Sequence, residues 1–77
     1  MDVVDFGWFQ PQGQTGIRLS WDRPTGILFL FHANSATGSW DEPIAEVSAA
    51  TARYIGDRWL EPDHGPEWVR AQVGVRS

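Results

Sequence analysis

The clearest pattern of hydrophobic and polar positions lies in the first half of the chain. Over 17–22, apolar and polar residues alternate, as in a strand with one buried face. An apolar run occupies 27–31, and between the two segments Pro24 and Gly26 stand where a tight turn favours proline and glycine. We therefore predict a β-hairpin. The residues on the apolar side of its first strand are Ile17, Leu19 and Trp21.

The second strand of this hairpin is apolar on both faces. Ile27, Phe29 and Phe31 share one side, and Leu28 and Leu30 share the other. Such a strand is normally central in its sheet and covered on both sides. We place Phe29 in the core, so that Phe29→Ala would cost about 3–5 kcal/mol. One helix covers only one face, so the other is closed by the aromatic N-terminus, by another chain or by a small ligand.

The N-terminal segment alternates more loosely than the hairpin. Residues 3–9 predict a short edge strand with Val4, Phe6 and Trp8 on one side. Residues 10–16 and 33–39 are rich in glycine, proline or small polar residues, which is typical of loops.

A helical period follows the second predicted loop. Apolar residues from Ile44 to Trp59 recur at helical spacing, and several alanines between them favour a helix. Asp41 can cap the N-terminus of this helix, and Pro43 suits its first turn. We predict a helix over 43–60.

The C-terminal residues return to a period of two. Apolar residues alternate with polar ones from Val69 to Val75, which predicts a strand; the alternative is the end of a short helix that starts near Pro66. The predicted order is β-β-β-α-β. We expect an α+β fold, with a small antiparallel sheet and one main helix packed on one face, in a single domain spanning 1–77.

Composition and charge restrict the classes of function. The chain has 77 residues and a net charge of −4, and all six of its basic residues are arginine. An acidic total argues against a nucleic-acid clamp and against docking on anionic membranes. The absence of cysteine excludes disulfides and thiolate metal sites. The N-terminal segment is acidic, whereas a signal peptide begins with basic residues. Together with the absence of cysteine, this favours a cytoplasmic location.

Catalytic chemistry finds little support in the sequence. The only histidines are His32 and His64, and His64 lies in the acidic segment 61–67. Carboxylates beside an imidazole could bind a metal ion, but the spacing matches no ligand motif. No nucleophile motif or phosphate-binding loop is present. We expect no catalytic residues, no metal, no cofactor and no enzymatic activity.

A short stretch of the sequence resembles a known family. Tyr54–Trp59 with Pro62 is similar to the end of the helix in MbtH-like proteins, the small partners of nonribosomal peptide synthetases, and Leu19–Trp21 is similar to part of their strand signature. The spacing from Gly26 to Tyr54 is longer than in that family, and its N-terminal pattern is absent. We therefore do not assign the chain to it. The resemblance implies that a domain of this size can act purely by binding another protein.

Five tryptophans are more than a core of this size can bury. We expect Trp21 and Trp59 in the core, where their strand face and helix stripe place them. Tryptophan is enriched at protein interfaces. The candidate interface residues are Trp8, Trp40, Trp68, Leu28 and Leu30.

These features favour a non-enzymatic protein-interaction module, either an accessory subunit or an inhibitor of the kind that phages encode. It would act through an exposed aromatic and apolar sheet face, and we expect a homodimer or another protein as its partner. Two alternatives remain: a dimeric nucleic-acid-linked regulator, and a small ligand- or metal-binding domain around His64.

Overall fold

The computed structural model describes residues 2–9, 16–34, 38–62 and 64–73. These residues form one antiparallel sheet with its strands in chain order, followed by two helices. The strands are β1 (Val3–Phe9), β2 (Gly16–Asp22), β3 (Ile27–Asn34) and β4 (Gly38–Glu46). The helices are α1 (Ala49–Gly56) and α2 (Pro66–Gln72). The α+β class is confirmed, but the predicted order β-β-β-α-β is wrong, since the observed order is β-β-β-β-α-α. The prediction of one main helix is not confirmed, because α1 and α2 are of similar length.

The predicted hairpin is confirmed as β2 and β3, which pair from Gly16↔Ala33 to Asp22↔Ile27. The turn begins at Asp22, whose carbonyl accepts a hydrogen bond from the Gly26 N–H at 2.7 Å. Gly26 has a φ of 76°, a conformation that glycine adopts at little cost. These contacts are local, so the sequence pattern was sufficient to predict the hairpin.

The first part of the predicted helix over 43–60 is wrong, because residues 38–46 form β4. This strand pairs with β3 from Asn34↔Gly38 to Ile27↔Glu46. Of the loop predicted over 33–39, residues 33–34 belong to β3, residues 38–39 belong to β4, and 35–37 lie outside the described residues. Without β4, the apolar strand β3 would present an unpaired edge. Pro43 is compatible with β4 because β4 is an edge strand.

The helix that does form starts later and ends earlier than predicted. Ser48, not Asp41, caps α1, and its hydroxyl accepts a hydrogen bond from the Thr51 N–H at 3.1 Å. The helix ends at Gly56. Trp59 follows in a turn, where it is fully buried, so its predicted place in the core is confirmed.

The strand predicted over 69–75 is also wrong within the described residues, because Pro66–Gln72 is helical. The alternative of a short helix that starts near Pro66 is confirmed. Proline suits the first turn of a helix because its missing N–H has no partner there in any case. Val69 and Val73 share a face at either period, so the apolar pattern did not separate the two structures.

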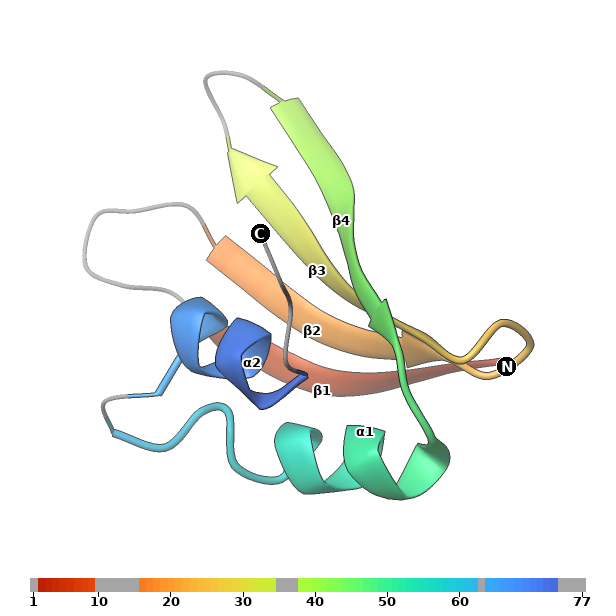
Figure 1. Ribbon diagram of the computed structural model, residues 1–77. Coiled ribbons are helices and arrows are strands. Elements are labelled where there is room, and N and C mark those ends of the chain that lie inside the picture. The colour runs from red at the N-terminus through yellow and green to blue at the C-terminus, as the bar shows by residue number, and fades with distance from the viewer. Residues whose placement is uncertain (1, 10–15, 35–37, 63, 74–77) are drawn as a thin grey trace.

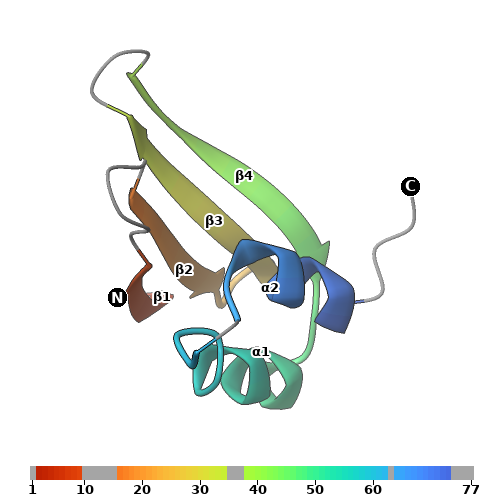
Figure 2. The same cartoon turned by 90° about the vertical axis from the view of Figure 1, so that its left-hand side faces the viewer.

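Both helices lie on the same side of the sheet, as the two ribbon views show (Figures 1 and 2). The fully buried core between the layers consists of Leu19, Leu28, Leu30, Ala52, Ile55, Trp59 and Val69. Neither described helix is long and apolar enough to cross a membrane.

The two faces of β3 therefore have roles opposite to those in the prediction, which placed Phe29 in the core and Leu28 and Leu30 at an interface. Leu28 and Leu30 face the helices and are 0% exposed, so they offer no surface to a partner, and their selection as interface residues is corrected. Phe29 and Phe31 alternate with them and face away from the helices. Phe29 is thus outside the core that α1 and α2 cover.

Candidate functional site

The side of the sheet opposite the helices is the largest candidate surface, and we call it the open face. None of the described elements packs on it (Figure 2). The strand register places the following residues there: Val3, Asp5, Trp8, Arg18, Ser20, Asp22, Ile27, Phe29, Phe31, Ala33, Ser39, Asp41, Pro43 and Glu46. The open face therefore combines three aromatic side chains with charged ones.

A bulge in β1 decides which aromatic residues reach this face. The pairing of β1 with β2 shifts between Asp5 and Trp8, and Gly7 in the bulge has a φ of 101°. Trp8 is thereby turned to the open face, while Phe9 reaches the core and packs on Trp59 with ring centroids 5.9 Å apart. The prediction that Trp8 shares a side with Val4 and Phe6 is wrong for this reason.

Trp8 is held in place by its neighbours although it is 42% exposed. Its ring meets Phe31 edge-on, with centroids 6.2 Å apart, and the Arg18 guanidinium lies 4.5 Å from the ring centroid. Arg18 also pairs with Asp5 at 3.2 Å. A Cβ atom at Gly16 would lie 2.9 Å from the Trp8 ring, so the ring rests against backbone that has no side chain.

Beside this aromatic cluster, the open face has a depression of about 270 Å³. Its lining residues are Val3, Ser20, Asp22, Phe29 and Asp41. Asp22 accepts hydrogen bonds from the Thr25 hydroxyl at 2.6 Å and from its backbone N–H at 3.3 Å. In the part of the chain that the structure describes, neither aspartate has an ion-pair partner. Two carboxylates thus line a depression together with Val3, Ser20 and Phe29.

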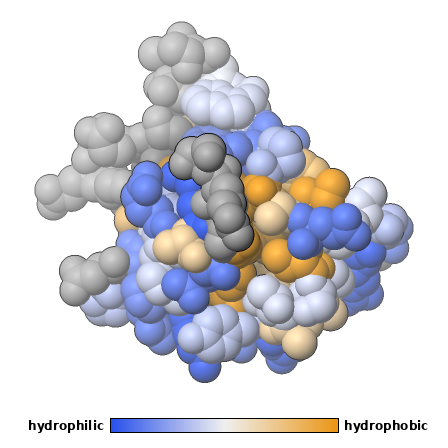
Figure 3. Space-filling model, in the orientation of Figure 1, coloured by the Kyte–Doolittle hydropathy of each residue, from blue (hydrophilic) through white to orange (hydrophobic). Residues whose placement is uncertain are grey.

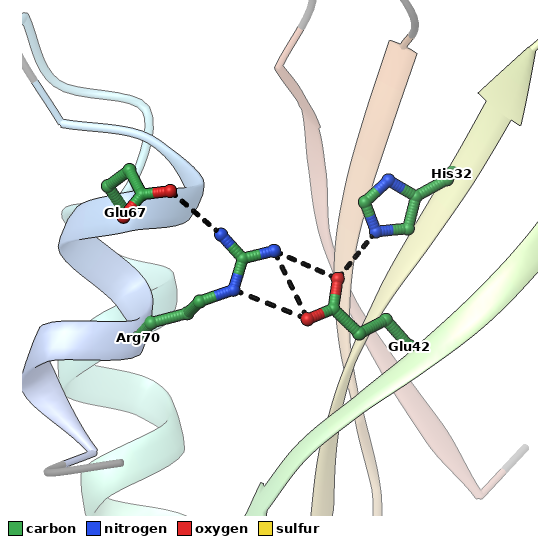
Figure 4. Close-up of polar contacts among 4 residues, drawn as sticks. All are labelled: His32, Glu42, Glu67 and Arg70. Carbon is green, nitrogen blue, oxygen red and sulfur yellow. Dashed lines mark hydrogen bonds and ion pairs between the residues drawn. The ribbon is translucent and has the colours of Figure 1, made fainter. Parts of the chain in front are cut away.

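A second group of functional side chains lies on the helix-bearing side (Figure 4). Glu42 of β4 accepts hydrogen bonds from Arg70 of α2 at 2.9, 3.1 and 3.3 Å, and His32 Nε2 lies 2.8 Å from its Oε1. Arg70 also contacts Glu67 at 3.2 Å. Trp40 stacks on His32 with centroids 4.6 Å apart. This network joins α2 to the end of the β3–β4 hairpin.

The electrostatics of the network identify its role. Hydrogen bonds from Arg70 lower the pKa of Glu42, against an opposing effect of burial, and His32 lowers it further. The Glu42 carboxylate in turn raises the pKa of Arg70. A carboxylate held ionised in this way is a poor proton acceptor at neutral pH. The network is therefore suited to anchoring α2 rather than to acid–base catalysis.

His64, the other histidine, is engaged in packing. Its ring stacks on Trp68 with centroids 4.1 Å apart, and its Nδ1 lies 2.7 Å from the Arg58 carbonyl oxygen. No cluster of potential metal ligands occurs among the described residues. Asp63, the neighbour that entered the metal hypothesis, lies outside them.

The helix-bearing side also carries an apolar patch, set among polar residues (Figure 3). Several partly buried apolar residues pack against the core, and those of β4, α2 and their flanks are Ile44, Val47, Trp68 and Val73. We therefore regard apolar surface on this side as the rim of the core.

The predicted interface tryptophans do not form one surface. Trp8 lies on the open face, Trp40 pairs with His32 on the opposite face and is 48% exposed, and Trp68 is partly buried against the core. Sequence reasoning missed Phe29, Phe31 and the flanking aspartates. The signal was present, because Arg18, Ser20 and Asp22 form the polar side of a strand that neighbours β3.

Comparison with known proteins adds no relationship to this geometry. No protein-family model, curated protein or solved structure matches the chain.

Proposed function

We propose that the protein is a non-enzymatic interaction module that binds another protein through the open face. One observation carries this proposal: Trp8, Phe29 and Phe31 gather on the side of the sheet that no described element covers. Aromatic clusters with a polar rim are typical of protein interfaces. The absence of cysteine supports a cytoplasmic location, because disulfides are rare in cytoplasmic proteins.

The fixed position of Trp8 supports the same function. A side chain already held by Phe31, Arg18 and the bare backbone of Gly16 loses little conformational entropy when a partner binds. Ordered aromatic residues of this kind serve as anchors in many interfaces.

The alternatives have weaker support. A nucleic-acid partner needs a basic surface, whereas the open face carries three aspartates, one glutamate and one arginine, a net charge of −3. Small-molecule sites usually have about 300–1,000 Å³, and the depression has about 270 Å³. The contacts of His64 with Trp68 and Arg58 argue against a metal site there.

Site-specific photo-crosslinking in the source cells tests this proposal. Val3 on the open face and Tyr54 on α1 are both 49% exposed, so they form a matched pair of positions for a photoreactive amino acid. We expect a discrete crosslinked protein from position 3 and none from position 54. Equal products from both positions, or a product from position 54 alone, would contradict the proposed function. A crosslink to a second copy of the chain would identify a homodimer.

A further inference from the structure

The open face has an excess of negative charge, and this inference rests on the proposed function. Asp5 is paired with Arg18, which leaves Asp22, Asp41 and Glu46 as its carboxylates without an ion-pair partner within the described residues. Asp22 and Asp41 line the depression. Phe29 lies on β3, between the strands that carry these aspartates, and each aspartate is two positions beyond the residue paired with Phe29. They are therefore its diagonal neighbours in opposite directions, each about 7–8 Å from Phe29, so the two aspartates lie about twice that distance apart.

We propose that the partner is a basic polypeptide segment that crosses this depression, with one lysine or arginine side chain near Asp22 at one end and another near Asp41 at the other. The methylene groups of these side chains lie along Phe29 and Val3. A cation near the Phe29 ring gains a further attraction from the ring electrons. The depression is smaller than typical small-molecule sites.

Charge also argues against a second copy as the occupant. Two open faces packed together would bring a net charge of −3 against another of −3. Like charges that face each other across an interface weaken binding, so they disfavour a second copy. A basic segment would instead place opposite charges across the interface. The neighbouring cluster of Trp8 and Phe31 supplies apolar contact for the rest of the segment.

An NMR titration of the whole chain with a defined probe tests this inference. The probe is a peptide of alternating lysine and alanine, and its matched control has glutamine in place of lysine. We expect saturable shifts at the backbone amides of Val3, Ser20 and Phe29 with the lysine peptide, weakening as salt is added. The glutamine peptide should cause none of these shifts.

Two matched double variants separate the site from net charge. In D22N/D41N, affinity for the lysine peptide should fall about tenfold, because two exposed or half-exposed charge pairs are lost and each contributes about a few-fold. Asparagine keeps the side-chain oxygen that accepts from Thr25, so the turn is retained. The control E61Q/E67Q changes net charge equally outside the open face and should bind as the parent does. If D22N/D41N does not fold, Asp41→Asn alone replaces it, since Asp41 is exposed.

Several results would overturn the inference. The first is equal binding of the glutamine peptide, and the second is an equal loss of affinity in the control variant. The third is butylamine, which has the alkylammonium group of lysine but no peptide, binding as tightly as the lysine peptide. Shifts in the same residues on concentrating the protein alone would identify a second copy as the occupant. If position 3 crosslinks a partner while the aspartate variants bind normally, this inference fails and the proposed function stands.

Discussion

The ring of Phe6 fills the space that a side chain at Gly56 would occupy. Phe6 lies on β1 and packs against the core, while Gly56 is the last residue of α1, so this contact joins the first strand to the first helix. On helix propensity alone, alanine at position 56 would stabilise the protein by about 1 kcal/mol. Packing opposes that gain, because a Cβ atom there would overlap the ring.

We expect Gly56→Ala to destabilise the protein by about 1–3 kcal/mol, as overpacked cores do. Urea denaturation measures the change. In a Phe6→Ala background the same substitution should be neutral or stabilising, because the space is then free. An equal loss of stability in both backgrounds would mean that Phe6 is not the obstacle.

The other glycine contact predicts an effect on the open face. Gly16→Ala should displace the Trp8 ring, since the new Cβ would lie 2.9 Å from it. Trp8 is partly exposed and can swing outward, so we expect a stability loss below about 1 kcal/mol. The indole N–H resonance of Trp8 should shift toward its solvent-exposed position. An unchanged Trp8 resonance in a folded variant would contradict this arrangement.

Leu30→Ala and Phe29→Ala compare the two sides of β3. Leu30 is fully buried, and its truncation should cost about 2–5 kcal/mol. Phe29 is only partly buried on the open face, so Phe29→Ala should cost less than Leu30→Ala despite the larger side chain. Thermal unfolding of both variants measures the order. A larger loss for Phe29→Ala would mean that the open face is covered in solution.

Glu42→Gln tests the network that anchors α2. At neutral pH we expect a loss of about 1 kcal/mol, since Arg70 makes several charge-assisted hydrogen bonds to a carboxylate that is only partly exposed. Because the folded protein lowers the pKa of Glu42 from its ordinary value of 4.5, this stabilisation is present above that pH. It disappears as the pH falls through the lowered pKa.

Urea denaturation at neutral pH and near about pH 3 should therefore give a difference between parent and Glu42→Gln that shrinks in acid. Glu67→Gln is the control. Its side chain is 96% exposed, so breaking its contact with Arg70 should have no measurable effect. A difference that stays constant over this pH range would exclude the titration of Glu42 as its cause.

The β2–β3 hairpin was predictable because its information is local. Alternation over 17–22 and the residues of the turn act over a few positions, and the contacts that close the turn lie within Asp22–Gly26. The buried position of Trp59 was predictable for a related reason, since one large apolar side chain closes an otherwise regular apolar pattern. The two apolar faces of β3 also predicted that the helical layer would cover only one of them and leave the other to the aromatic N-terminus, another chain or a ligand.

Only the tertiary structure decided which face of β3 the helices leave uncovered. The residues from Ile44 onward fit a helical period, yet part of this segment is a strand because it pairs with the free edge of β3. That pairing joins residues as far apart in the sequence as Ile27 and Glu46, so a local pattern does not show it. Once α1 and α2 pack against Leu28 and Leu30, Phe29 and Phe31 must face the other way. The bulge at Gly7 then brings Trp8 to the same side. Period and composition determine which segments are apolar, but the packing of distant segments determines which apolar residues remain accessible, and therefore where the candidate site lies.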